Sequence, residues 1–355
     1  MPEHKQDKQK QRKVPFYRKR TFLWITGSIV GVVLLVLIAF AVSPWPGAMV
    51  IRYVFSKNDV KTTEALEKHA PTTPITLIAD QKYRSNDGDA LLDVYFPESI
   101  KQTDKKLPVV IWTHGGAWVS GGKADNATYY KLIASQNYTV ISVDYTLGPE
   151  KKYPTAVHQL NDMYAYVQKN ASRFHADTDK IFLAGDSAGS QLSSQMATII
   201  TSPHYAKQVG VSSNLKPTQL KGVILNCGIY KMDALIQPDP SLPKIIGWGD
   251  DVSIWAYTGS RDRHNATLTE MSAMYHATKD FPATYISGGN ADPLTDAQAK
   301  PFAQKLQSLG VDVTTLFYPE DHQPELPHEY QFNLDNQDGQ NALTATLSFI
   351  KKHSQ

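Results

Sequence analysis

The sequence predicts an α/β fold built on a mostly parallel, eight-stranded sheet with helices on both faces. Two observations lead to this prediction. Eight short apolar runs, several rich in β-branched residues at consecutive positions, are typical of strands whose two faces are both covered. Between these runs, apolar residues recur at helical spacing, and strands that alternate with helices indicate a parallel sheet.

The predicted elements follow one another from residue 75 to the C-terminus. The strands cover residues 75–80, 90–96, 108–114, 138–144, 180–185, 221–226, 283–289 and 311–318. The helices cover residues 125–136, 155–170, 188–200, 294–309 and 340–352. Residues 75–355 are therefore expected to form one domain.

The segment between the sixth and seventh strands, residues 227–282, is too long for a simple crossover connection. It contains several aromatic residues and the proline-rich stretch PDPSLP. We predict one or two helices and a lid, together a small helical cap over the C-terminal edge of the sheet, where open α/β sheets bind ligands. The alternative is a surface insertion without a function.

The N-terminal region predicts one transmembrane helix. Residues 1–20 carry eight Lys or Arg and two Asp or Glu, and residues 22–42 contain no charged residue. Fourteen residues of this second stretch are Leu, Ile, Val or Phe, and the stretch is long enough to span a hydrocarbon core. We therefore predict a transmembrane signal-anchor over residues 21–43, located in the cell membrane. By the positive-inside rule, residues 1–20 form a basic cytoplasmic tail and the body of the protein is extracytoplasmic.

This apolar stretch has two alternative interpretations. Ala39 and Ala41 form a site of the A-x-A type, so a cleaved signal peptide would give a secreted protein. The apolar run exceeds the usual length of a signal-peptide core, which favours a retained anchor. A buried core helix is seldom apolar on every face at the end of a chain. Residues 44–74 follow as a partly helical connector or cap segment.

Composition excludes several classes of function. The 355-residue chain has a net charge of +2, but beyond residue 20 it contains 28 basic and 32 acidic residues. A mildly acidic body does not fit a nucleic-acid-binding surface. The single cysteine, Cys227, follows an apolar run, and zinc-type ligand spacing is absent from the sequence. We expect neither a metal nor an organic cofactor.

The stretch LAGDSAGSQL, residues 183–192, places Ser187 where a strand pattern gives way to a helical one. Gly185 and Gly189 flank the serine in a G-x-S-x-G pattern. A serine on such a sharp turn is a candidate nucleophile, and small neighbours are needed because the turn is crowded. Nucleophilic chemistry also requires a base, an orienting acid and donors for an oxyanion.

The third predicted strand runs directly into HGGAW, residues 114–118. Glycines let backbone N–H groups approach a substrate closely, so Gly115, Gly116 and Ala117 are candidate oxyanion donors. We expect His114 to hold this loop, and Trp118 to form a wall of the substrate pocket or to belong to the core. Asp292 lies in a turn just after the seventh strand, from which a short carboxylate can reach an imidazole beside the serine; the alternative is a helix-capping or turn aspartate.

Four motifs resemble, in order and spacing, the hormone-sensitive-lipase-like branch of the α/β-hydrolase family. They are HGGAW, VDYTLGPEKKYPTAV, GDSAG and ADPL, and the resemblance covers most of residues 75–355. It implies an α/β-hydrolase fold, a Ser–Asp–His triad and an oxyanion loop. Ser187 matches the nucleophile, Asp292 the acid, and the amides of Gly116, Ala117 and Ala188 match the oxyanion donors. The chain departs from the family's usual HGGG and GDSAGG with HGGA and GDSAGS.

Two histidines after the last predicted strand are candidates for the base. His322 lies close to the strand end, within the reach typical of the family. His328 precedes Glu-Tyr-Gln-Phe and so looks more like the family's histidine with a trailing aromatic residue. We predict His328 as the base and keep His322 as the alternative. A metal site formed by the pair is not expected, because no second ligand cluster accompanies it.

The predicted function is a serine carboxylesterase that hydrolyses short- to medium-chain acyl or acetyl esters of small molecules. The nucleophile Ser187 attacks the ester, the histidine takes its proton, and water then hydrolyses the acyl-enzyme. Two alternatives remain: a serine peptidase of the same fold, and a membrane-anchored binding protein without catalysis. The complete set of Ser, Asp and His candidates argues against loss of catalysis, and no recognition domain typical of a peptidase is visible in the sequence.

Overall fold

The computed structural model describes residues 16–235 and 244–355. Residues 1–15 of the predicted basic tail and the PDPSLP stretch lie outside the described residues. The chain divides into two compact units, Met1–Pro46 and Gly47–Gln355. Each unit is described by itself below.

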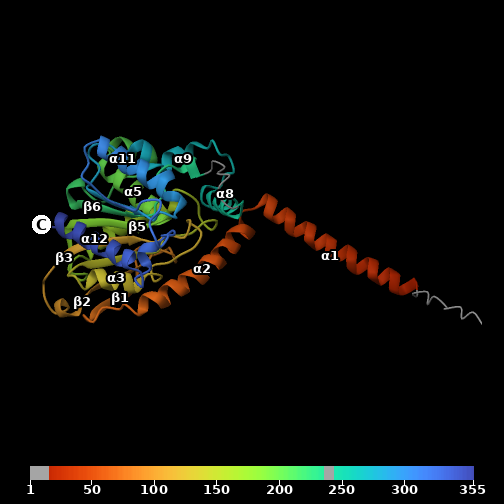
Figure 1. Cartoon of the computed structure of the whole chain (residues 1–355), viewed down its shortest axis with the longest axis horizontal. Helices are drawn as coiled ribbons and strands as arrows, with labels where there is room; N and C mark the ends of the chain where they lie inside the picture. The colour runs from red at the N-terminus through yellow and green to blue at the C-terminus, as the bar shows by residue number, and fades with distance from the viewer. Residues whose placement is uncertain (1–15, 236–243) are drawn as a thin grey trace, which may run out of the picture. The chain divides into compact units, whose positions relative to one another are not determined.

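The first unit contains one long helix, α1 (Phe16–Val42) (Figure 1). Its segment Thr21–Val42 has a mean hydropathy of 2.8, and none of it is buried. By length and composition this helix can cross a membrane, although a signal sequence meets the same criteria. The predicted apolar segment is therefore a continuous, exposed helix.

The second unit is built on one eight-stranded sheet with the order β1-β2-β4-β3-β5-β6-β7-β8. The strands are β1 (Ile75–Lys82), β2 (Leu91–Pro97), β3 (Leu107–Thr113), β4 (Thr139–Val143), β5 (Ala176–Asp186), β6 (Leu220–Asn226), β7 (Thr284–Gly288) and β8 (Val313–Phe317). β1 pairs antiparallel with β2, and β2 with β4, whereas every other pair is parallel. The predicted mostly parallel, eight-stranded sheet is confirmed.

The strand ends differ from the prediction where pairing decides them. β5 begins at Ala176 rather than residue 180, because its start pairs with Leu107 and Pro108 of β3. β8 covers only Val313–Phe317 rather than residues 311–318, because it is an edge strand and its one partner, β7, offers five residues. A strand therefore extends as far as a neighbour can satisfy its backbone groups.

The helical elements surround the sheet. In chain order they are α2 (Trp45–Glu67), η1 (Glu98–Ile100), α3 (Ala127–Ala134), α4 (Thr155–Lys169), α5 (Ala188–Thr201), α6 (Pro203–Val209), η2 (Pro217–Gln219), α7 (Met232–Leu235), α8 (Lys244–Thr258), α9 (Ala266–Met271), α10 (Ala273–His276), the π-helical turn η3 (Thr295–Ala299), α11 (Lys300–Ser308), η4 (Tyr330–Phe332) and α12 (Gln337–His353). All five predicted helices are present within a few residues of their expected ends.

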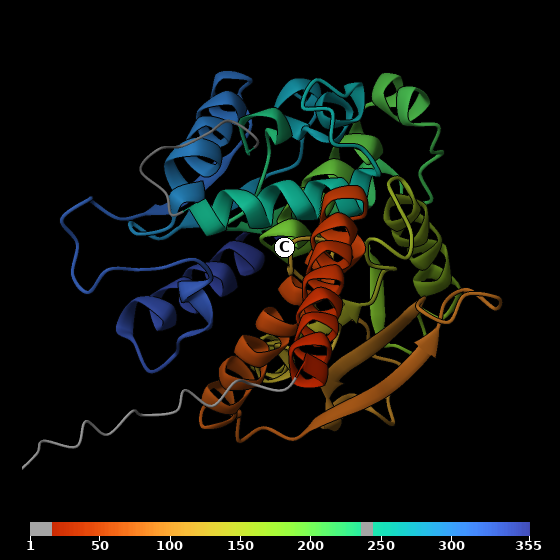
Figure 2. The same ribbon diagram turned by 90° about the vertical axis from the view of Figure 1, so that its right-hand side faces the viewer.

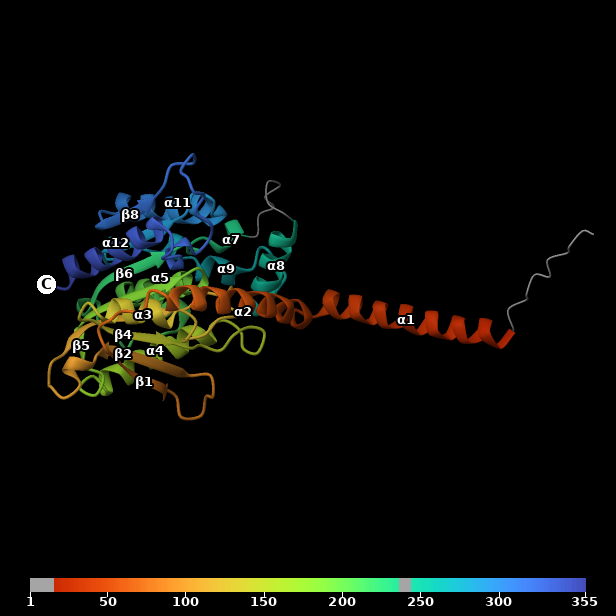
Figure 3. The same ribbon diagram turned by 60° about the horizontal axis from the view of Figure 1, so that its bottom comes forward.

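Both faces of the sheet are covered by helices (Figures 1 and 3). On one face, α3 and α12 form a buried cluster with Val110 and Trp112 of β3. On the other, α4, α5 and α11 form a larger cluster with Val109 and Ile111 of the same strand. Successive side chains of a strand point to opposite faces, so one continuous apolar run serves both clusters.

Residues 227–282 hold more helical segments than expected. Of the described residues, four segments fall in this region: α7, α8, α9 and α10. α8 packs against α2, since Val252 and Ala256 of α8 share a buried cluster with Ala48 and Ile51 of α2. The predicted connector is therefore a long helix that joins the cap.

Candidate active site

Ser187 occupies a strained turn between β5 and α5. Its backbone has φ 49° and ψ −119°, a conformation that L-residues rarely adopt. Its N–H donates to the carbonyl of Asn226 at 3.0 Å, which ties the turn to the end of β6. The side chain is nearly buried, with 7% exposure, but lines a cavity. The turn thus aims the hydroxyl out of the end of the sheet.

The two glycines of the G-x-S-x-G pattern make this turn possible. A Cβ at Gly189 would collide with the backbone carbonyls of Thr113 and His114, and one at Gly185 would collide with the carbonyl of Gly189. α5 can therefore start directly against the ends of β3 and β5. The crowding that the sequence predicted at this turn is present at both positions.

The loop after β3 presents free amides beside Ser187. Gly116, Ala117 and Trp118 all have positive φ, at 94°, 52° and 59°. The Gly116 carbonyl turns inward and accepts from the N–H groups of Val119 and Ser120 at 3.1 and 2.9 Å. Among the described residues, none accepts a hydrogen bond from the N–H of Gly116 or Ala117. These two amides are available to a bound anion or polarised carbonyl.

Gly115 differs from the prediction. Its N–H donates to the Asp186 carboxyl at 2.8 Å, so it is not available as an oxyanion donor. His114 Nδ1 donates to the Gly115 carbonyl at 2.8 Å, and the His114 ring stacks on Tyr145. Gly115 and His114 therefore anchor the loop from which the next two amides project.

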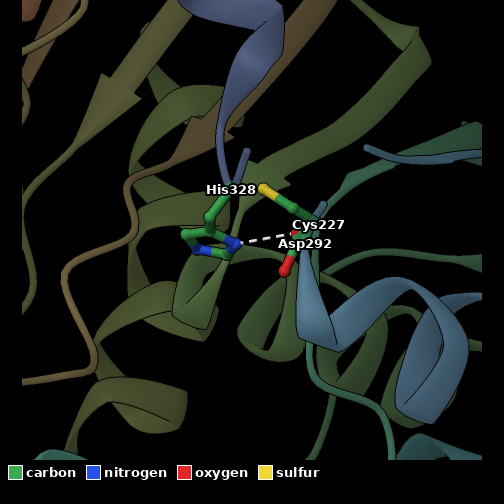
Figure 4. A group of neighbouring side chains, drawn as sticks. All are labelled: Cys227, Asp292 and His328. Carbon is green, nitrogen blue, oxygen red and sulfur yellow. Dashed lines mark hydrogen bonds and ion pairs between the residues drawn. The ribbon is translucent and has the colours of Figure 1, made fainter. Parts of the chain in front are cut away.

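Asp292 and His328 form a hydrogen-bonded pair (Figure 4). Asp292 follows β7 and is inaccessible to solvent, and its Oδ2 lies 2.9 Å from His328 Nδ1. A carboxylate oxygen can only accept, so Nδ1 carries the proton and Nε2 is left as the basic nitrogen. The second carboxylate oxygen, Oδ1, accepts from the N–H of Leu294 at 2.9 Å, which fixes the orientation of the carboxylate.

His322 lies elsewhere. Its Nε2 contacts Asp338 Oδ2 at 2.8 Å, near the start of α12. Asn290 bonds to the backbone of the loop that carries both histidines: its Nδ2 donates to the His322 carbonyl at 3.0 Å, and its Oδ1 accepts from the N–H of Leu326 at 2.9 Å. This clamp holds the loop after β8 against the turn that contains Asp292. Asn290 is not among the predicted site residues, although it lies two residues before Asp292.

The surroundings of His328 are acidic. Burial lowers the pKa of His328, but the charge and hydrogen bond of Asp292, followed by Glu329 and Asp186, outweigh it and raise the pKa to about 9. Glu329 Oε1 lies 3.9 Å from His328 Nε2. Burial raises the pKa of Glu329 and, with the Glu329 carboxyl, raises that of Asp186 to about 8. Among the groups that raise the pKa of His328, Asp292 contributes most, through both its charge and its hydrogen bond.

Cys227 completes a compact group with this pair (Figure 4). Within residues 16–235 and 244–355, Cys227, Asp292 and His328 form the group of potential metal ligands whose donor atoms lie within 4.8 Å of one another. Burial raises the pKa of the Cys227 thiol well above its usual range, so the sulfur stays protonated. Both oxygens of Asp292 already accept hydrogen bonds. The donor set fits a carboxylate–imidazole pair better than a metal site.

One cavity of about 970 Å³ brings these elements together. Its lining includes Ser187, Asp292 and His328, together with Gly116, Ala117 and Trp118 of the loop after β3. Ala188, the remaining predicted donor, begins α5 and is fully buried behind Ser187. Every predicted site residue except Gly115, Ala188 and His322 thus borders the same space.

The walls of the cavity come largely from the cap. Trp118 is buried, stacks on Tyr257 of α8 at 5.4 Å and donates from Nε1 to Gln191. It is therefore both a core residue and a wall residue. α2 contributes Phe55, Asn58 and Asp59, and α8 contributes Ile246, Trp248 and Asp250. Burial and the nearby Asp125 and Asp186 carboxyls raise the pKa of Asp59 to about 7.

Comparisons with known proteins agree with this architecture. Residues 110–323 match the family described as the alpha/beta hydrolase fold, and residues 57–153 match the carboxylesterase family. An arylesterase of Saccharolobus solfataricus is 37% identical over 142 residues, which is 40% of this chain and 45% of the arylesterase. The carboxylesterase NlhH of Mycobacterium tuberculosis is 28% identical over 252 residues, 68% of this chain and 71% of that protein. The chain thus spans about half the length of the arylesterase.

Solved structures share the fold at lower identity. Esterase B from Lactobacillus rhamnosis, in a form inhibited by a tributyrin phosphonate, superposes with a TM-score of 0.72 at 20% identity. The superposition covers 87% of this chain and 96% of the esterase. At this identity the likeness establishes the arrangement of the elements alone.

Proposed function

The chain belongs to the α/β-hydrolase fold family, and on that premise we propose that it is a carboxylic ester hydrolase that works through an acyl-enzyme on Ser187. The main support for this proposal is the position of Ser187. It occupies a strained elbow that lines the same cavity as His328 and the buried Asp292 to which His328 is hydrogen-bonded. The names of the esterase relatives support the same reaction class.

In the proposed first step, the Ser187 oxygen attacks the ester carbonyl carbon while His328 Nε2 takes the hydroxyl proton. Asp292 holds the imidazole in the tautomer with a free Nε2 and stabilises the imidazolium that forms. The charge that develops on the carbonyl oxygen is stabilised by the amides of Gly116 and Ala117, joined by that of Ala188. The proton on Nε2 is then donated to the departing alkoxide, which leaves as the alcohol.

The second step repeats this chemistry with water. His328 takes a proton from a water molecule, the hydroxide attacks the acyl-enzyme, and Ser187 recovers its proton as the carboxylic acid departs. The acidic neighbours of His328 stabilise its protonated form in both steps. We propose short- to medium-chain or acetyl esters as substrates, because Trp118 and the aromatic residues of the cap line the cavity.

The first test of this function is hydrolysis of p-nitrophenyl esters of increasing acyl length by the full chain in detergent. Release of p-nitrophenol that is fastest for short or medium acyl chains would support the proposed reaction and substrate range. A folded protein that hydrolyses none of these esters would contradict the proposal.

A pH profile tests the role of His328. The base acts only when neutral, and its pKa is raised to about 9, so kcat/KM should rise with pH through the alkaline range rather than near the ordinary histidine value of about 6.5. Asp292→Asn removes the carboxylate that raises the pKa. In this variant the rise of kcat/KM with pH should occur at lower pH, and kcat should fall by about 10⁴-fold. A native profile that is already flat above about pH 7 would contradict this assignment.

We also propose that α1 is retained as a signal-anchor, with residues 1–20 cytoplasmic and residues 44–355 outside the cytoplasm. The length and hydropathy of Thr21–Val42 and the charge of the preceding segment support this topology. On this proposal the protein meets its substrates at the outer side of the cell membrane.

A further inference from the structure

Apolar side chains are exposed in unusual number at one place on the second unit. Val50, Tyr53, Val54 and Phe55 of α2 and Ile245 and Ile246 of α8 form this group, which we term the apolar rim. Tyr53, Val54 and Ile245 are 65%, 55% and 67% exposed. Clusters of exposed apolar side chains on a soluble surface mark interaction sites.

The two parts of the rim belong to helices that pack together, with the first turn of α2 against the middle of α8. A Cβ added to Gly47 of α2 would lie 2.9 Å from Val252 and 3.3 Å from Trp248, both on α8. Ala48 and Ile51 share a buried cluster with Val252. Figures 2 and 3 show these two helices beside each other at the same end of the unit.

The rim borders the candidate active site. Phe55 and Ile246 are both exposed to solvent and line the cavity that contains Ser187. The cavity therefore reaches the surface between α2 and α8. A partner that covers the rim would therefore lie beside an opening of the cavity.

The charge pattern on α2 indicates a lipid surface. Val50, Tyr53 and Val54 share one outward face at helical spacing, and the exposed Lys57 and Lys61 continue that face towards the C-terminus. Lys57 Nζ lies 5.7 Å from the Tyr53 ring centroid. An apolar, aromatic face that ends in lysines is typical of helices that insert into a bilayer interface and meet anionic headgroups.

The sequence adds a second argument for the bilayer. Only Ser43 and Pro44 separate the end of the apolar segment, Val42, from α2. Three residue steps span at most about 11 Å of extended chain. A membrane-anchored α1 would therefore keep the first turn of α2 close to the bilayer surface.

We propose that the apolar rim is a bilayer-docking surface through which uncharged lipid esters pass from the membrane into the cavity. The docking surface is inferred from the exposed side chains and the packing of α2 and α8, whereas the identity of the ester rests on the proposed function. Esters with a short or medium acyl chain on a lipophilic alcohol fit both proposals.

Labelling of introduced cysteines tests the docking surface. The native Cys227 is buried, so Val54→Cys and Ile245→Cys variants can be labelled selectively with an environment-sensitive fluorophore. The full chain is placed in phosphatidylcholine–phosphatidylglycerol vesicles that carry nitroxide groups on their acyl chains. Glu64→Cys is the matched control, since Glu64 is exposed on the same helix beyond the lysines.

We expect the labels at positions 54 and 245 to emit at shorter wavelength and to be quenched several-fold more strongly than the label at position 64. Equal quenching at all three positions would overturn the proposal. A shift that grows with protein density but shows no quenching by the lipid nitroxides would also overturn it, because a second copy of the chain would then cover the rim.

A second experiment separates docking from catalysis. The double variant Tyr53→Asp/Val54→Asp should hydrolyse an ester dissolved in the vesicles at least about tenfold more slowly. Its turnover of water-soluble p-nitrophenyl acetate should stay unchanged, because neither residue lines the cavity. Equal loss on both substrates would contradict the role in substrate entry. If the native chain hydrolyses neither ester, the proposed function fails, while the quenching result still decides the docking surface.

Discussion

Replacement of Ser187 by alanine is expected to reduce kcat for p-nitrophenyl esters by about 10⁶-fold. In the proposed reaction the Ser187 hydroxyl forms the acyl-enzyme, and the buried Cys227 thiol cannot replace it because burial raises its pKa and keeps it protonated. Truncation to alanine removes one oxygen from a side chain whose backbone contacts remain. The fold should therefore persist, as measured by circular dichroism and thermal unfolding.

Ser194→Ala is the matched control for this variant. Ser194 lies on the same helix, α5, is equally buried, and donates locally to the Gln191 carbonyl at 2.9 Å. It does not line the cavity. Ser194→Ala should keep its activity and lose about 1 kcal/mol of stability. If Ser187→Ala retained turnover, the assignment of the nucleophile would be wrong.

The second large effect is expected at His328. His328→Ala should lower kcat to about the level of Ser187→Ala, because the nucleophile and its base act as one unit. His322→Ala should leave kcat unchanged, since the His322 ring contacts Asp338 rather than Asp292. We expect His322→Ala to lower the free energy of unfolding by about 1 kcal/mol, because the contact with Asp338 near the start of α12 is lost.

Both histidine variants are measured with the same ester and the same unfolding assay. The double variant His328→Ala/Ser187→Ala should be no slower than either single variant, because the two residues belong to one catalytic unit. Turnover that is lost with His322 and kept without His328 would reverse the assignment of the base.

Much of the fold could be predicted because most strands correspond to short, continuous apolar runs in the sequence. The continuous apolar run at residues 108–113 packs on both faces of the sheet, as such runs do in parallel sheets. The antiparallel start was not predicted, because β1 and β2 are joined by a short connection and their pairing depends on which neighbour each strand finds. Strand order depends on contacts between residues distant in the sequence, so local hydrophobicity patterns do not predict it.

Residues of the candidate site could be predicted where their neighbours in the sequence specify them, but not where residues distant in the sequence do. Ser187 is specified by its flanking glycines: a Cβ at Gly189 would meet the carbonyls of Thr113 and His114, and one at Gly185 would meet the backbone of Gly189. The pairing of Asp292 with His328 rather than His322 depends on Asn290, which bonds to the loop after β8 across 32 and 36 residues of chain. The predicted Gly115 donor fails for a similar reason, since Asp186, 71 residues away, takes its N–H.

The sequence predicted residues 44–74 as a partly helical connector or cap segment, but did not indicate which of these residues line the cavity. Phe55, Asn58 and Asp59 line the cavity although they precede the first strand by about 20 residues. The reason is tertiary: Arg52 donates to the carbonyls of Val119 and Gly148 and pairs with Glu150, which fixes the helix across the end of the sheet. α2 therefore lines the site because of contacts between residues that are 67 to 98 positions apart in the sequence.

Ser187 is proposed here as an activated nucleophile beside the Asp292–His328 pair. The most direct measurement is covalent labelling of the full chain by an alkyl p-nitrophenyl phosphonate, followed by peptide mass spectrometry. We expect one phosphonyl group per chain on the peptide that contains Ser187, formed in step with the loss of esterase activity and absent from Ser187→Ala and strongly slowed in His328→Ala. A folded native chain that remains unlabelled, or that is labelled at another residue, would contradict the account.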